Sequence, residues 1–239
     1  EQAEGNRFML IGFGPSPADI PIDAWYTADK LLRVEQGTDT LRLCFAAGPM
    51  EPEFSVTAPS TGGIRFCTEE KGYFEPDAVG NLIFSQEAGE RVVQFQTEDG
   101  TGFSLDIEEN GGWKIEIADS EATVQRTFSS SSFAFGYAGG VLQKVRLTLP
   151  IAEDEMLFGL GERFSGLDQV GERQFFWNTD CCYHGRSEHY ELWRAYKNIP
   201  LLHSSQGNSL FFNSFYPAVS DVGYTDAARC VWEFWGPVF

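Results

Sequence analysis

One stretch decides the fold: residues 156–213, which read MLFGLGERFSGLDQVGERQFFWNTDCCYHGRSEHYELWRAYKNIPLLHSSQGNSLFFN. Its first residues form a short apolar run that predicts a strand. The run is interrupted at Gly159 and Gly161, where the backbone can take a positive φ without a Cβ clash. Two further strand-like runs, 201–204 and 209–213, close the stretch. The pattern predicts strands that flank a long polar loop.

The loop between these strands combines aromatic and polar side chains. It carries Phe-Phe-Trp-Asn-Thr-Asp at 175–180, and the residues after it are rich in His, Arg, Glu and Tyr. Aromatic rings stack on the apolar faces of a pyranose, while carboxylates and guanidinium groups bind its hydroxyls. The composition therefore predicts a sugar-binding surface.

Outward from this stretch, the chain shows the two-residue alternation of half-buried strands. Apolar and polar residues alternate in the runs 41–45, 93–96, 103–107, 113–117 and 145–149. Each run places its apolar side chains on one face, and glycine-containing turn signals separate the runs. No convincing pattern of a long amphipathic helix is found in the sequence. The sequence predicts an all-β, antiparallel fold, a β-sandwich or barrel, with few or no helices, as one domain over 1–239.

Composition excludes several classes of protein. The 239 residues are 42% hydrophobic and 15% aromatic, which indicates a substantial core, and the net charge is −18. Nucleic acids and anionic membranes attract clustered Lys and Arg, so neither is an expected partner. Five cysteines without a CxxC pair indicate reduced thiols and a cytoplasmic location. No run approaches the ~18 apolar residues of a membrane span.

Glycosidic bond hydrolysis requires paired carboxylates, so acidic residues of the loop region are candidates. They are Asp168, Glu172, Asp180, Glu188 and Glu191, and no spacing singles out a pair. Asp180 is favoured as a ligand contact because it follows an aromatic run and an Asn at a predicted strand end. The alternative is that Asn178 and Asp180 form Asx turns that shape the loop.

Other reactive residues are interpreted as structural. His184 and His189 lack a helical i, i+4 spacing, His203 lies in a strand-like run, and no metal site is expected. Cys181 and Cys182 have no evident activating base. Glu162-Arg163, after the two glycines, is interpreted as an ion pair or loop brace. No cofactor motif is present.

Four motifs together resemble glycoside hydrolase family 31, the family of α-glucosidases, α-xylosidases and related retaining enzymes. They are Phe-Gly-Leu-Gly-Glu-Arg-Phe at 158–164, Trp-Asn-Thr-Asp at 177–180, Tyr-Lys-Asn-Ile-Pro at 196–200, and Ser-Gln-Gly at 205–207 before Leu-Phe-Phe-Asn at 210–213. Their order is that of the family's N-terminal β-sandwich, which is similar to galactose mutarotase. The resemblance is good from about residue 145 onward.

The resemblance implies that this chain is one domain of a larger enzyme whose catalytic residues lie on another domain. Residues 162–198 correspond to a loop that reaches toward the active site. In that loop Asp180 contacts the sugar, and Trp177 and Asn178 support it. The nucleophile and acid/base of the family lie on a catalytic barrel, and no barrel pattern is present here, because the chain ends where the barrel would begin. The resemblance implies α-linked glucosides or xylosides as substrates, the barrel as partner, and an inactive isolated chain.

Two alternatives belong to other classes. The first is a stand-alone carbohydrate-binding or assembly module without catalysis. An exposed apolar patch favours the domain of a larger enzyme over such a module, because a docking face needs one. The second is a mutarotase-like enzyme, which requires His and carboxylate groups on a concave sheet face and ranks last. A homo-oligomer is left open.

Overall fold

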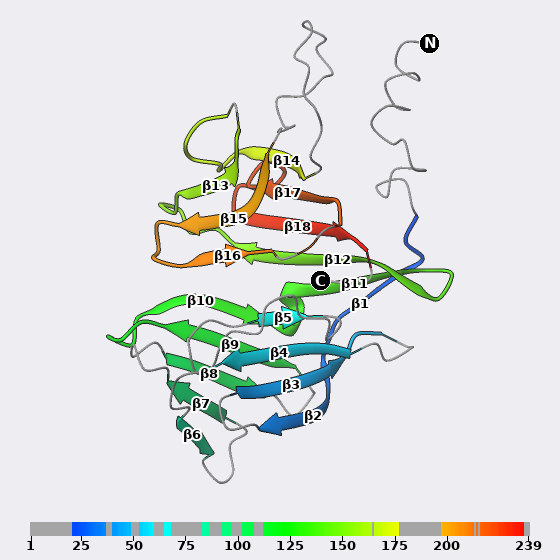
Figure 1. Cartoon of the computed structure of the whole chain (residues 1–239), viewed down its shortest axis with the longest axis vertical. Coiled ribbons are helices and arrows are strands. Elements are labelled where there is room, and N and C mark those ends of the chain that lie inside the picture. Colours follow the sequence, from blue (N-terminus) through cyan, green and yellow to red (C-terminus); the bar gives the residue numbers. More distant parts are fainter. Residues whose placement is uncertain are drawn as a thin grey trace, which may run out of the picture. The chain divides into compact units, whose positions relative to one another are not determined.

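The computed structural model describes residues 21–36, 40–48, 53–59, 65–67, 83–86, 92–96, 102–107, 112–163, 165–176, 197–212, 214 and 216–236. Among these residues the regular elements are strands, apart from one 3-10 turn, η2 (Ser130–Ser132) (Figure 1). The predicted all-β class is therefore confirmed.

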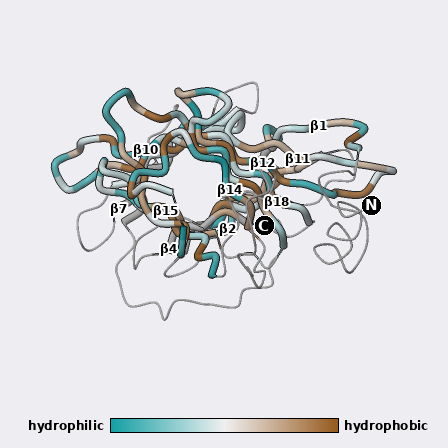
Figure 2. The backbone as a smooth tube through the Cα atoms, turned by 90° about the horizontal axis from the view of Figure 1, so that it is seen from above, coloured by the Kyte–Doolittle hydropathy of each residue, from teal (hydrophilic) through white to brown (hydrophobic). Residues whose placement is uncertain are grey.

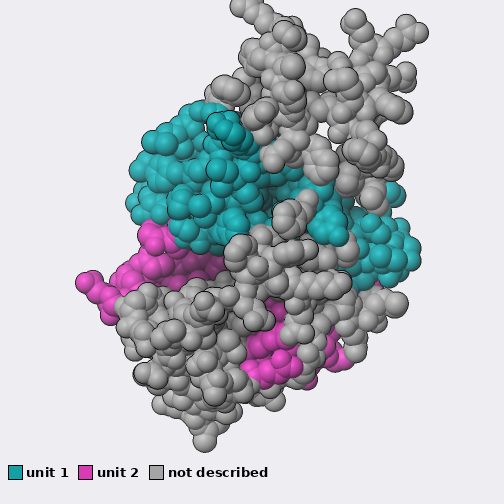
Figure 3. Space-filling view, in the orientation of Figure 1, with its two compact units in different colours: residues 1–24, 136–205, 209–236 teal, residues 25–135, 206–208, 237–239 magenta. Residues whose placement is uncertain are grey.

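The chain divides into two compact units (Figure 3). Unit 1 consists of Glu1–Ala24, Gly136–Ser205 and Ser209–Gly236. Unit 2 consists of Trp25–Phe135, Gln206–Asn208 and Pro237–Phe239. The expectation that residues 1–239 act as one domain stays a prediction.

A six-stranded sheet, most of which belongs to unit 1, has the order β1-β11-β12-β18-β17-β14. Its strands are β1 (Ala24–Tyr26), β11 (Phe133–Ala138), β12 (Val141–Pro150), β18 (Arg229–Trp235), β17 (Ala218–Val222) and β14 (Glu172–Phe176). Unit 1 also contains a three-stranded sheet of β13 (Leu157–Gly161), β15 (Asn198–Ser204) and β16 (Ser209–Phe211), in that order. The pairs β12–β18, β17–β18 and β13–β15 are antiparallel.

Aromatic side chains form the core of unit 1. Trp232, fully buried on β18, stacks on Phe212 with ring centroids 4.0 Å apart. Phe176, at the end of β14, lies 4.8 Å from Trp232 on the same measure. Large aromatic rings bury more apolar area than most side chains, so this cluster dominates the packing of the unit. It also fixes the end of β14, which leads into the predicted loop.

Two further sheets of the described residues lie wholly within unit 2. One has the order β10-β9-β8-β7-β6 and the other the order β2-β3-β4-β5. Their strands are β2 (Lys30–Gln36), β3 (Thr40–Ala46), β4 (Glu53–Pro59), β5 (Arg65–Cys67), β6 (Ile83–Gln86), β7 (Val92–Gln96), β8 (Gly102–Ile107), β9 (Trp113–Ala118) and β10 (Val124–Ser129). Phe45 from one sheet lies 5.2 Å from Trp113 of the other, ring centroid to ring centroid. The two sheets therefore share an aromatic core, as in a sandwich.

The five alternating runs of the sequence are all strands: β3, β7, β8, β9 and β12. Apolar residues are interspersed with polar ones along the described strands (Figure 2). On β12, Val145, Leu147 and Leu149 are buried, while the residues between them are partly exposed. On β9 and β12 the two-residue period reflects burial of one face, whereas on β3 consecutive residues from Leu43 to Ala46 are buried.

Candidate functional site

The structure describes both ends of the predicted loop but not its middle. Trp177, Asn178 and Asp180 lie outside the described residues, so their contact with substrate stays a prediction. β14 ends at Phe176, directly before them. Residues 177–196 are called the loop segment below. The candidate site is built from the residues that hold its two ends.

Three consecutive residues of β13 have a positive φ: Gly159 (115°), Leu160 (70°) and Gly161 (89°). The register of β13 against β15 shifts between the two glycines. A Cβ on Gly159 would collide with the carbonyl of Leu201, and one on Gly161 with the carbonyl of Lys197. The glycines therefore let β13 lie close to the backbone that follows the loop segment. The expectation of positive φ at both glycines is confirmed.

The side chain of Arg163 contacts the chain on both sides of the loop segment. Its Nη2 donates a hydrogen bond to Oδ1 of Asn198 at 2.6 Å, and its Nε donates to the carbonyl of Leu160 at 2.9 Å. Its Cζ lies 4.7 Å from the ring centroid of Phe176. A planar guanidinium can stack on a ring and donate in its own plane at the same time. Phe176 precedes the loop segment and Asn198 follows it, so Arg163 clamps its base.

Glu162 adds a weaker contact at the same place. Its backbone N–H donates to the carbonyl of Lys197 at 3.1 Å. Its carboxylate forms an ion pair with Lys197 at 3.5 Å, and both side chains are exposed, so the pair contributes little. The interpretation of Glu162-Arg163 as a loop brace is confirmed, and the short, partly buried contacts of the brace belong to Arg163.

The other candidate carboxylates have structural roles or lie outside the described residues. Oδ1 of Asp168 accepts hydrogen bonds from the N–H groups of Leu157 and Val170, both at 3.1 Å. Asp168 therefore supports the turn before β14. Glu172 is the first residue of β14 and is partly buried. Two further candidates, Glu188 and Glu191, are not described.

No metal site is found in the part of the chain that the structure describes, where no three His, Cys, Asp or Glu side chains cluster suitably. His203 is exposed on β15, and its Nδ1 lies 2.7 Å from Oγ of Ser209 on β16. Four other residues that the sequence analysis weighed as metal ligands or reactive thiols lie outside the described ranges: His184, His189, Cys181 and Cys182. No described helix is long and apolar enough to cross a membrane.

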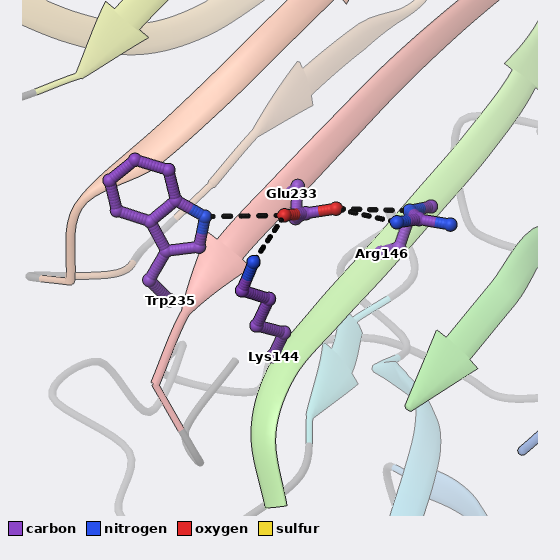
Figure 4. Close-up of polar contacts among 4 residues, drawn as sticks. All are labelled: Lys144, Arg146, Glu233 and Trp235. Carbon is purple, nitrogen blue, oxygen red and sulfur yellow. Dashed lines mark hydrogen bonds and ion pairs between the residues drawn. The ribbon is translucent and has the colours of Figure 1, made fainter. Parts of the chain in front are cut away.

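A charged cluster joins β12 to β18 (Figure 4). Glu233 accepts a hydrogen bond from Lys144 at 3.0 Å and two from Arg146, at 2.7 and 3.1 Å. The indole N–H of Trp235 donates to Glu233 at 3.3 Å. Lys144 is buried, with 6% of its surface exposed, so its charge needs this partner. The cluster fixes the register of the last described strand against β12.

The environment of Glu233 favours its ionised form. Burial raises the pKa of the carboxyl, but the hydrogen bonds and charges of Arg146 and Lys144 outweigh burial, and the net shift is downward. A lowered pKa in the folded state stabilises the fold above the pKa of the unfolded chain, about 4.3. That contribution is lost as the pH falls through the folded-state pKa.

We expect Glu233→Gln to lower the free energy of unfolding at pH 7 by about 2 kcal/mol, because it leaves a buried cation without a counter-charge. Urea denaturation followed by Trp fluorescence measures the loss. The difference from the wild type should shrink as the pH falls through the lowered folded-state pKa of Glu233, because protonation then removes the counter-charge from the wild type as well. Glu162→Gln, which removes an exposed ion pair, is the matched control and should have little effect. Equal effects of the two substitutions would contradict a special role for Glu233.

The sequence analysis missed this cluster. Lys144 and Arg146 alternate with buried residues on β12, which indicates that they share a face, but their partner is 89 and 87 positions away. Only the pairing of β12 with β18 identifies Glu233 as that partner. Single-strand periodicity carries no information on which strands pair.

Antiparallel sheets with aromatic cores define an all-β sandwich as the class of this protein. The particular family follows from its sequence. The model of the glycosyl hydrolase 31 N-terminal galactose mutarotase-like domain matches residues 53–221, and the chain belongs to this family. The resemblance stated from the motifs is thereby confirmed. Comparison with curated protein sequences gives no match.

Solved enzyme structures share the fold of this chain. The cycloalternan-forming enzyme of Listeria monocytogenes, solved with a pentasaccharide substrate, has a TM-score of 0.70 and 14% identity, covering 89% of this chain and 20% of that one. A GH31 dextranase of Flavobacterium johnsoniae, solved with isomaltotriose, has a TM-score of 0.63 and 17% identity, covering 89% and 26%. This chain thus spans between a fifth and about a quarter of the length of these enzymes. At these identities the similarity shows the fold alone.

Proposed function

We propose that this chain is the N-terminal domain of a retaining α-glycosidase that hydrolyses α-linked glucosides or xylosides. The observation that carries the proposal is the family match over residues 53–221. Bond breaking occurs on a catalytic barrel in the same polypeptide, through a covalent glycosyl-enzyme and a second carboxyl group as acid/base. The β-sandwich supports that barrel and contributes one loop to its active site.

Within the predicted range 162–198, which includes β14, the loop segment contributes substrate contacts. Asp180 binds a sugar hydroxyl near the cleavage point, and Trp177 and Asn178 support it. The clamp at Arg163 favours this role, because a contact aids catalysis only when the contacting group is held in position. A loop that merely connected β14 to β15 would not require a stacked and hydrogen-bonded guanidinium at its base.

An exposed apolar face next to the loop segment supports docking to another domain. Ile199 on β15 has 51% of its surface exposed, and Phe211 on β16 has 62%. Phe211 pairs with Leu201, two residues from Ile199, so the three side chains share one face of the sheet. Apolar residues gathered on a sheet face indicate an interaction surface. This is the feature that distinguishes a domain of a larger enzyme from a self-contained module.

Two further expectations are part of the proposal. A cytoplasmic location fits the two buried thiols that the structure describes, Cys44 and Cys230. The partners are neutral sugars and the barrel, which fits a net charge of −18 better than a polyanion does. Whether the chain forms a homo-oligomer is left to a sedimentation measurement.

The test compares two polypeptides on aryl α-glucosides and aryl α-xylosides. We expect no turnover above the enzyme-free rate from residues 1–239. A polypeptide extended through the downstream coding sequence should release the aryl alcohol and retain the anomeric configuration. Turnover by residues 1–239 alone would contradict the proposal, as would an extended polypeptide that binds sugars without hydrolysing them. The second result would favour a carbohydrate-binding module.

A further inference from the structure

We propose that the core of unit 1 contains a binding site for one ordered water molecule, formed by Gln174, Ser220 and Trp232. Gln174 lies on β14, Ser220 on β17 and Trp232 on β18, and these strands are neighbours in the six-stranded sheet (Figure 1). The inference goes beyond the proposed function and does not depend on it, because it concerns how the sandwich itself is held together.

The strand register brings the three side chains into one row. Ser220 is the direct partner of Gln174 on one side and of Trp232 on the other. Directly paired residues point to the same face of a sheet, and neighbouring strands lie about 4.8 Å apart. Gln174 is 1% exposed, and Ser220 and Trp232 are fully buried. The row therefore lies inside the core, where bulk solvent does not reach its polar atoms.

Each of the three side chains has one buried polar atom without a hydrogen-bond partner among the described residues: Oε1 of Gln174, Oγ of Ser220 and Nε1 of Trp232. Phe212 stacks on the Trp232 indole at an interplanar angle of 21°, so the in-plane N–H does not point at that ring. Buried polar atoms are nearly always hydrogen-bonded, either to protein or to ordered water. Three such atoms in one row point to a shared partner.

The orientation of the Gln174 amide is fixed by its neighbour Gln169. Nε2 of Gln169 donates to the carbonyl of Gly166 at 2.6 Å, so Oε1 of Gln169 occupies the other position of that amide. This oxygen accepts a hydrogen bond from Nε2 of Gln174 at 3.1 Å. Rotating the Gln174 amide would place two oxygens against each other. Oε1 of Gln174 is therefore the atom that needs a donor from elsewhere.

The row presents one acceptor, one hydroxyl and one donor. The amide Oε1 of Gln174 only accepts, the indole N–H of Trp232 only donates, and the hydroxyl of Ser220 does both. A cation would face the N–H, and an anion would face the amide oxygen, so neither fits. A buried water donates and accepts, and it typically makes about three hydrogen bonds. Here it donates to Gln174, accepts from Trp232 and bonds to Ser220.

NMR of the 239-residue chain tests the site without any substitution. In heteronuclear NOESY and ROESY spectra, the indole N–H of Trp232 should show a cross-peak at the water frequency with the sign of a long-lived contact. Trp113 is the matched control, because it is also buried but its Nε1 donates directly to the carbonyl of Ala28 at 2.6 Å. Trp113 should show no such cross-peak. A Trp232 indole that is as silent as that of Trp113 would overturn the proposal.

Ser220→Ala provides a second test, in which the sign of the effect decides. A hydroxyl that is bonded to the water stabilises the fold, so its removal should raise the equilibrium constant of unfolding about fivefold. A buried hydroxyl without a partner destabilises the fold, and its removal would lower that constant. Urea denaturation followed by Trp fluorescence measures the change as a shift of the midpoint. A midpoint that rises or stays the same in Ser220→Ala would contradict the water site.

Discussion

Gly161→Ala should destabilise unit 1 by about 4 kcal/mol, a large part of the about 5–15 kcal/mol that typically holds a protein folded. Two costs add. The φ of 89° at Gly161 is unfavourable for any residue with a Cβ. The added methyl group would also collide with the carbonyl of Lys197 and lie 2.7 Å from the N atom of Ile199. Both atoms belong to backbone, so neither can move away as a side chain would.

Urea denaturation of the 239-residue chain, followed by Trp fluorescence, measures the loss as a lower midpoint. Gly166→Ala is the matched control in the same unit. A Cβ at Gly166 has its nearest neighbour at 3.7 Å, an ordinary contact distance, and its φ is not in the positive region that disfavours a side chain. Its midpoint should stay within the error of the wild type. Equal midpoints for the two variants would show that β13 does not need to approach β15 as closely as described.

The sequence predicted the strands well because the information is local. The alternation of apolar and polar residues in the sequence predicted β9 and β12, and the apolar residues of the alternation are the more buried ones. The glycines of β13 indicated positive φ. Glu162-Arg163 was interpreted as an ion pair or loop brace, and the bracing contacts belong to Arg163. The partners of Arg163 could not be predicted, because Phe176 and Asn198 contact it only when the strands β13, β14 and β15 are paired in their sheets.

Long-range polar contacts were the part that the sequence could not supply. The carboxylate of Glu233 resembles any other acidic side chain in a chain with a net charge of −18. Its significance comes from Lys144, which the fold buries and which therefore needs a counter-charge. The substrate contact of Asp180 was predicted from its place after an aromatic run and from the family motifs, and it stays a prediction because residues 177–196 lie outside the described residues.

Asp180→Ala should lower kcat/KM of the polypeptide that includes the catalytic barrel by about thirtyfold. A hydrogen bond to a charged group contributes about 2 kcal/mol, and each 1.36 kcal/mol corresponds to a factor of about ten. If the contact forms mainly in the transition state, kcat should fall; if substrate and transition state are bound equally, KM should rise. Asp180→Asn, which keeps a hydrogen-bonding side chain without the charge, should retain part of the activity.

The matched control for Asp180 is Asp154→Ala. Asp154 is an exposed aspartate in the turn between β12 and β13, in the same unit. Its removal changes the net charge by the same amount as the removal of Asp180. It should leave kcat/KM unchanged, since screening by salt weakens the effect of distant exposed charges. A similar loss for both variants would show that overall charge, not a substrate contact, is responsible.

The measurement that decides most directly whether this β-sandwich serves a catalytic centre on another domain is kcat/KM of the extended polypeptide on an aryl α-glucoside and an aryl α-xyloside, with Asp180 and with Asp180→Ala. We predict that the better substrate loses about thirtyfold on substitution, while Asp154→Ala loses nothing. Equal kcat/KM for the Asp180→Ala variant and the wild type would show that the loop segment does not reach the substrate through this carboxylate.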